Sequence, residues 1–67
     1  MLVEELCQRY REGERDFRRI NLREGDLTNI ILPGVNFCRA DLRQARLGKI
    51  RLGRSLLREA DLSEAIL

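Results

Sequence analysis

The chain has 67 residues, 43% of them apolar, and a formal net charge of +2. A chain of this length forms one small domain at most, and its core alone supplies only a few kcal/mol of stability. Two cysteines without a histidine disfavour a structural zinc site, which needs four Cys or His ligands. No apolar run approaches the roughly 18 residues of a membrane span. We therefore expect no metal, no cofactor and no membrane-spanning segment.

Residues 1–14 are expected to form a short capping helix followed by a turn. Over residues 2–12 the apolar side chains recur at helical spacing: Val3, Leu6, Cys7 and Tyr10. Gly13 is a plausible helix stop. The glutamates of "MLVEELCQRY" differ from the lysines of a signal peptide, which indicates a cytoplasmic protein. A disulfide between Cys7 and Cys38 is one alternative; we expect instead two reduced thiols, with Cys7 packed and Cys38 exposed.

A five-residue repeat follows the helix. From Phe17 onward every fifth residue is Phe or Leu: Phe17, Leu22, Leu27, Leu32, Phe37, Leu42, Leu47, Leu52, Leu57, Leu62 and Leu67. Two residues before each centre stands a small or aliphatic residue, with Arg15 as the exception, and the position just before the centre is often Asp or Asn. The unit therefore reads small, polar, Leu, polar, polar.

This spacing predicts a square coil. The small residue and the leucine lie two apart, so in a short extended segment they point to the same face. The next two residues must turn the chain, and a turn of constant sense every five residues closes a coil after four units. "LPGV" at 32–35 fits a type II turn, with Pro and Gly at its centre. Gly48 and Gly53 also fall where the chain should bend.

The pattern resembles that of the pentapeptide-repeat proteins, A-(D/N)-L-x-x, which "ADLRQ" (40–44) and "ADLSE" (60–64) match fully. The lead-in "LCQRYREGERDFRRINL" is similar to the opening of cyanobacterial members. The resemblance implies an all-β solenoid, a right-handed quadrilateral β-helix of about two and three-quarter coils with a short N-terminal capping α-helix. We expect residues 1–14 to be the cap and residues 15–67 the repeat domain.

A twenty-residue coil places the repeat centres in vertical columns, with coils about 4.8 Å apart. Phe17, Phe37 and Leu57 then share one column. We interpret the centres as a structural core and not as a ligand site: Phe17, Leu22, Leu27, Leu32, Phe37, Leu42, Leu47, Leu52, Leu57 and Leu62.

The C-terminal coil is expected to bind a partner. The sequence shows no helix, proline or charged segment after Leu67 to cover the strand edge, and an open edge offers unpaired N–H and C=O groups to another chain. Leu56 and Ile66 put apolar side chains outward where the pattern expects Asp or Asn. Either the chain is a fragment of a longer repeat protein, or this edge packs against a protein partner or a second copy.

The residues offer little for catalysis. Without histidine, Ser–His and Cys–His nucleophile pairs are excluded. Asp41 and Asp61 fall in one column with Asn21, but the family pattern expects Asp or Asn there as acceptors for the local backbone. We therefore expect a non-catalytic structural or interaction module. The alternative function is a DNA mimic that interacts with topoisomerase, as some family members do, which the short length and the positive charge disfavour.

A basic cluster is the one other surface feature: Arg46, Lys49, Arg51 and Arg54. One interpretation is a binding surface for an acidic protein, nucleic acid or anionic lipid. The other, which we favour, is a solvated face balanced by acidic residues on neighbouring coils: Glu24, Asp26, Glu59 and Glu64. Nucleic-acid binding is further disfavoured because the three aromatic residues are assigned to the interior or the cap.

Overall fold

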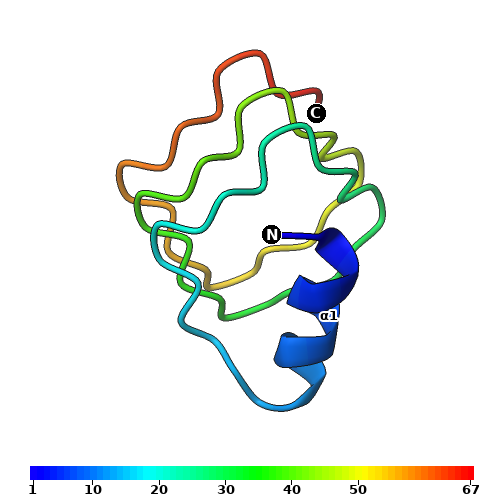
Figure 1. Ribbon diagram of the computed structural model, residues 1–67, viewed down its shortest axis with the longest axis vertical. Coiled ribbons are helices and arrows are strands. Elements are labelled where there is room, and N and C mark those ends of the chain that lie inside the picture. Colours follow the sequence, from blue (N-terminus) through cyan, green and yellow to red (C-terminus); the bar gives the residue numbers. More distant parts are fainter.

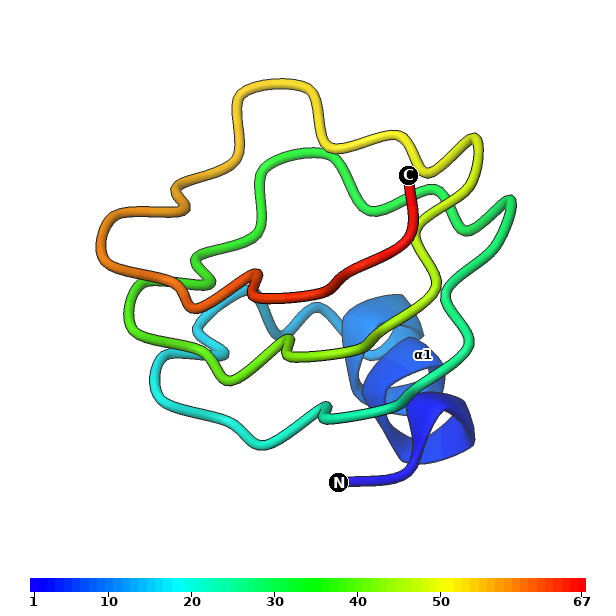
Figure 2. The same ribbon diagram turned by 90° about the horizontal axis from the view of Figure 1, so that it is seen from above.

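The computed structural model describes residues 1–67 as one helix followed by a four-sided spiral. Helix α1 spans Val3–Arg11. It begins and ends within a residue of the predicted limits, and Gly13 just beyond it adopts a φ of +103° that suits a glycine. Figure 1 shows α1 beside the first coil, while the C-terminal segment lies at the far end of the stack; the turned view in Figure 2 agrees.

The coils are held together by single-residue parallel bridges that recur every five residues. Each bridge joins residues 20 apart, from Asp16 with Asn36 to Arg46 with Ile66. On each side of a bridge the backbone bonds run between coils, as in Leu22 N–H to Asp41 O at 2.8 Å and Asp41 N–H to Ile20 O at 2.8 Å. No continuous strand forms, because the chain turns again before a second residue can join the ladder. The twenty-residue register predicted from the sequence is confirmed.

We number the four faces in the order in which the chain reaches them. The first face comprises residues 15–19, 35–39 and 55–59; the second, 20–24, 40–44 and 60–64; the third, 25–29, 45–49 and 65–67; the fourth, 30–34 and 50–54. Residues 15–34 are the first coil, residues 35–54 the second, and residues 55–67 lie beyond the second.

The two residues after each repeat centre form a corner of the spiral, and the second of them has a positive φ. At one corner this residue is Gly34, whose φ of +76° fits the type II turn predicted for "LPGV". At the other corners the position holds a non-glycine residue with φ between 56° and 62°: Arg19, Glu24, Asn29, Arg39, Gln44, Lys49, Arg54, Glu59 and Glu64. Gly48 and Gly53 therefore stand at the bends, as expected, but the positive φ belongs to the residue after each.

The repeat centres line the interior. The seven centres of the first part of the spiral are buried: Phe17, Leu22, Leu27, Leu32, Phe37, Leu42 and Leu47. The rings of Phe17 and Phe37 stack with centroids 6.1 Å apart. Leu52 is half-buried, and Leu57 and Leu62 remain 37% and 42% exposed. The assignment to the structural core is wrong for Leu57 and Leu62, because the coil that carries them has a neighbouring coil on one side only.

Helix α1 packs on the first coil. Leu6 is fully buried against the core, and the Tyr10 hydroxyl donates to Pro33 O at 2.7 Å. A Cβ on Gly25 would lie only 3.0 Å from Leu22 O and 3.2 Å from Val3 Cγ2, so a residue without a side chain lets the helix approach. Arg15, the exception to the small-residue rule, stacks its guanidinium 3.6 Å from the centre of the Tyr10 ring.

A serine replaces the usual hydrogen bond in one turn. At eight corners the small residue donates its N–H back to the preceding centre, as Ala40 does to Phe37 O at 3.0 Å. In the turn from Leu32 to Val35, Ser55 of the next coil stands in between. Its Oγ accepts from Val35 N–H and donates to Leu32 O, each at 3.2 Å.

Candidate interaction surfaces

On the first and second faces, aspartate and asparagine side chains accept a hydrogen bond from the backbone of their own repeat. Asp41 Oδ1 accepts the backbone N–H of Arg43 at 3.2 Å, two residues on, and Asp61 Oδ1 accepts that of Ser63 at 3.0 Å. Asp16, Asn21 and Asn36 make the same contact. The sequence-based interpretation of the Asp column as local backbone acceptors is confirmed.

Ion pairs accompany these contacts. Arg43 donates its Nε and Nη2 to the Asp41 carboxylate at 2.9 and 2.8 Å, and its Nε lies 3.9 Å from Asp61 Oδ2. The side-chain hydrogen bond from Arg43 is the main reason that the pKa of Asp41 falls to about 2. Arg39 pairs with Glu59 of the next coil at 2.7 Å. Three arginines of the first two faces, Arg18, Arg39 and Arg43, are thus paired with carboxylates within the chain.

The third and fourth faces have few acidic residues. They carry the predicted basic cluster, which is exposed and has no ion pair with any carboxylate: Arg46, Lys49, Arg51 and Arg54. Asp26 is the one acidic residue on these faces, and Thr28 occupies its carboxylate through a backbone and a side-chain hydrogen bond. Glu59, expected to balance the cluster, is engaged by Arg39 on another face.

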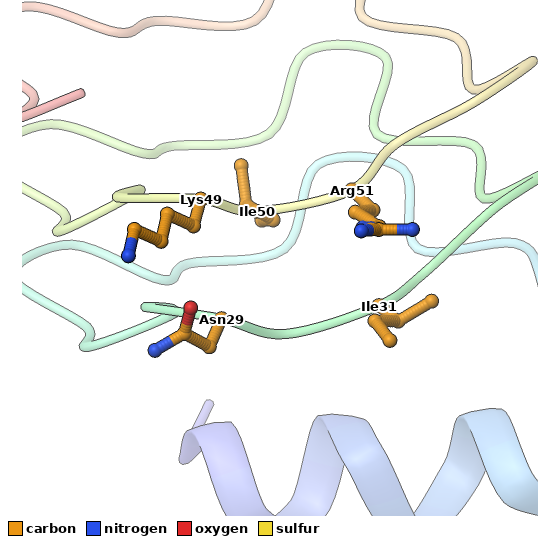
Figure 3. A pocket seen from close by; sticks show the side chains of 5 residues that line it. All are labelled: Asn29, Ile31, Lys49, Ile50 and Arg51. Carbon is orange, nitrogen blue, oxygen red and sulfur yellow. The ribbon is translucent and has the colours of Figure 1, made fainter.

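A shallow hollow lies within this surface. Asn29, Ile31, Lys49, Ile50 and Arg51 line it, and Figure 3 shows Lys49 and Arg51 on one coil alongside Asn29 and Ile31 of the preceding coil. Ile31 stands at an outward bridge position and is 61% exposed. The hollow thus combines an apolar side chain with free cationic groups. Ile31 was not singled out from the sequence, although it breaks the Asp or Asn rule as clearly as Leu56 does.

A second group of candidate contact residues consists of exposed apolar side chains on residues 55–67. The structure exposes each of the residues that the sequence assigned to partner binding there, with Ile66 at 59% and Leu67 at 90%, and Leu56 is likewise exposed. Leu57 and Leu62 add to them. We call this group the C-terminal surface: Leu56, Leu57, Leu62, Ile66 and Leu67.

The cysteines are both unpaired. Cys7 and Cys38 are half-buried, so Cys38 is less exposed than its outward position predicts. Its backbone N–H is bonded to Asn36 Oδ1 at 3.1 Å. No group of three or more His, Cys, Asp or Glu side chains comes together as metal ligands would. No helix combines the length and the apolar character that crossing a membrane requires.

The five-residue spiral identifies the class of protein. The chain matches the family described as pentapeptide repeats, with 8 copies, over residues 16–53 and 39–67. It therefore belongs to the pentapeptide-repeat family, whose fold is the right-handed quadrilateral β-helix.

The chain is also similar to a solved structure. This is HetL, a pentapeptide repeat protein involved in heterocyst differentiation regulation from the cyanobacterium Nostoc sp. strain PCC 7120. The two share 54% sequence identity with a TM-score of 0.97. The match covers 100% of this chain but only 28% of the HetL chain. The cyanobacterial resemblance of the lead-in agrees with this similarity. A comparison with curated protein sequences gives no match.

Proposed function

We propose that this chain is a non-catalytic protein-interaction module that binds through its C-terminal surface. The observation that carries the proposal is the exposure of apolar side chains there, such as Ile66 at 59% and Leu56 at 55%. The backbone N–H groups of Leu57 and Leu62 also find no acceptor, whereas those of Leu22 and Leu42 bond to the next coil. Apolar side chains beside open backbone donors are stabilised when another chain covers them.

The occupant we propose is a second copy of the chain. Helix α1 already covers the opposite end of the spiral, where Leu6 is fully buried and Met1 donates its terminal ammonium to Asn21 O at 2.6 Å. Two copies therefore meet through the same end of each, which makes the contact isologous. The fold in this proposal is the one the sequence predicts: a cap at residues 1–14 and a repeat domain of about two and three-quarter coils at residues 15–67.

Light scattering of the 67-residue chain over a concentration series tests the proposal. We expect a dimer that dissociates on dilution and a monomer for Ile66→Asp, because a charged carboxylate would replace an apolar side chain of the proposed contact. Ile31→Asp is the matched control: Ile31 is exposed to a similar extent, 61%, but lies on the fourth face. A strict monomer at all concentrations, or an Ile66→Asp variant that dimerises as the parent does, would refute self-association.

We further propose that the chain serves in regulation, as HetL does, and acts in the cytoplasm, where its two thiols stay reduced. The similarity to HetL and the absence of histidine support a regulatory and non-catalytic role. A chimera in which residues 1–67 replace the matching segment of HetL tests this in Nostoc. We expect the chimera to restore the heterocyst pattern of a strain that lacks HetL. Failure of a well-expressed chimera would argue against a shared role.

A further inference from the structure

In the second coil, the third and fourth faces lack the carboxylates that accept the backbone N–H two residues later on the second face; in the first coil, Asp26 of the third face still makes this contact with Thr28. On the second face, Asp41 accepts both the backbone N–H and the guanidinium of Arg43. In the second coil of the third and fourth faces, Arg46 and Arg51 occupy the corresponding position. The N–H groups two residues later, on Gly48 and Gly53, donate to no acceptor in the chain. Each repeat here therefore presents an unused backbone donor next to an unpaired cation.

We propose that these two faces bind an acidic segment of a partner protein. The partner's carboxylates accept the N–H groups of Gly48 and Gly53 and pair with Arg46 and Arg51. A carboxylate from another molecule thus makes the contacts that Asp41 makes within the chain. Hydrogen bonds of this kind, between ionised groups and with backbone N–H donors, are among the stronger ones available to a protein surface.

The two glycines support this assignment because the fold does not demand them. Neither Gly48 nor Gly53 has the left-handed backbone that favours glycine. A Cβ on Gly53 would meet nothing within 4 Å, and one on Gly48 would make an ordinary contact with Thr28 Cγ2 at 3.7 Å. At the equivalent positions of the second face stand Arg23 and Arg43. The glycines thus leave the two backbone donors open to an approaching ligand.

The surroundings of the cluster favour a peptide over other polyanions. Single-stranded nucleic acid is held in part by stacking on aromatic side chains, but Phe17 and Phe37 are buried and the Tyr10 hydroxyl is bonded to Pro33 O. The exposed Ile31 and the half-buried Ile50 give a bilayer little apolar surface to bury. Ile31, beside Lys49 and Arg51 in the hollow of Figure 3, instead suits an apolar side chain set among acidic ones. Glu24 and Glu64 stand at the corner before the third face, which confines the positive surface to one side.

A labelled peptide tests the proposal by fluorescence anisotropy. The probe is a fluorescein-labelled twelve-residue peptide that alternates pairs of glutamates with leucine, and its glutamine counterpart is the uncharged reference. We expect binding of the acidic peptide only, with an affinity that falls as NaCl is raised because the contacts are exposed ion pairs. The double variant Arg46→Asp, Arg51→Asp should weaken binding at least tenfold.

This double variant should fold, since aspartate stands at the equivalent positions of the other faces, as at Asp16, Asp41 and Asp61. Thermal melting followed by circular dichroism checks that it does. The matched control reverses the same charge on the other faces with Arg23→Asp, Arg58→Asp, both exposed and free of ion pairs. It should bind the peptide much more tightly than the first variant.

Three results would overturn the proposal. The first is equal loss of binding in the two double variants, which would indicate a response to net charge alone. The second is equal binding of the glutamine peptide. The third is a preference for a twenty-nucleotide oligo-dT or for phosphatidylserine vesicles over the acidic peptide, which would assign the surface to a different partner. Leu56→Asp, which alters the C-terminal surface on the first face and away from Arg46 and Arg51, should leave peptide binding intact, so this test is independent of self-association.

Discussion

Replacing Ser55 with alanine is a change for which the structure and the repeat pattern predict opposite effects on stability. Alanine is the residue that the pattern favours at this position, so the pattern alone predicts a neutral or stabilising change. In the structure, however, Ser55 Oγ bonds to Val35 N–H and Leu32 O, each at 3.2 Å, in a turn that has no backbone bond of its own. Val35 is fully buried, so water cannot readily take the place of the hydroxyl.

The expected loss follows from those two contacts. A hydrogen bond contributes a net 0.5–1.5 kcal/mol, and the two contacts are partly buried, so Ser55→Ala should lower the free energy of unfolding by about 1–2 kcal/mol. For a chain of this size the melting temperature should fall by roughly 4–16 °C. Thermal melting followed by circular dichroism, at a fixed protein concentration, measures the change.

The control places a hydroxyl where the turn is already closed. Ala60 lies one coil beyond Ala40, whose N–H donates to Phe37 O at 3.0 Å. Ala60→Ser should therefore give no gain in stability, because no backbone group there needs the hydroxyl. A Ser55→Ala variant that melts at or above the parent would show that the turn from Leu32 to Val35 closes by itself, and the reasoning would be refuted.

Three further predictions concern single positions. Gly25→Ala should destabilise the fold by about 1–3 kcal/mol in chemical denaturation, because its Cβ would press on Val3 of α1 at 3.2 Å. Gly34→Ala should cost about 1–2 kcal/mol in the same assay, because an alanine at a φ of +76° is strained. Asp41, whose pKa is lowered to about 2 mainly by its hydrogen bond from Arg43, should contribute stability above pH 4 that is lost as the pH falls toward 2. Denaturation at pH 5 and pH 2 should show Asp41→Asn clearly less stable than the parent at the higher pH only.

Each of these has its own contrary outcome. Gly48→Ala is the control for both glycine variants, since its Cβ has room and its backbone is not left-handed; it should be neutral or stabilising by up to about 1 kcal/mol. Equal destabilisation at Gly25 and Gly48 would contradict the contact with α1. A stability gap between parent and Asp41→Asn that stays constant from pH 5 to pH 2 would contradict the lowered pKa.

The sequence predicted the parts of the fold that repeat. The burial of centres such as Phe17 and Leu42, and the twenty-residue register, follow from a five-residue period that few structures can satisfy. The exposure of Leu57 and Leu62 did not follow, because periodicity tells which side a residue faces and not whether another coil covers it. The contact between Gly25 and α1 depends on where the helix lands, which no local pattern encodes.

The sequence predicted which residues make up the candidate sites, but not which of their charged groups form ion pairs. The arginines of the basic cluster and the apolar Ile66 are visible as departures from the Asp or Asn rule. Whether Arg46 is neutralised depends on carboxylates about twenty residues away in the sequence. It also depends on which cation each of those carboxylates binds. Glu59, for example, pairs with Arg39. The free N–H groups of Gly48 and Gly53 could be recognised only by comparison with the other faces, where an Asp or Asn side chain accepts the equivalent N–H.

The bridges between residues 20 apart also restrict how a gene for such a chain can change length. Removing one codon within the spiral would turn every later centre from the interior toward water. Removing five would keep the interior intact but rotate everything downstream by a quarter of a circle. Loss of residues 25–29, for instance, would carry Arg46 and Arg51 onto the second and third faces. Surfaces in this architecture can thus be moved around the axis by whole-repeat deletions or duplications, without new packing having to evolve.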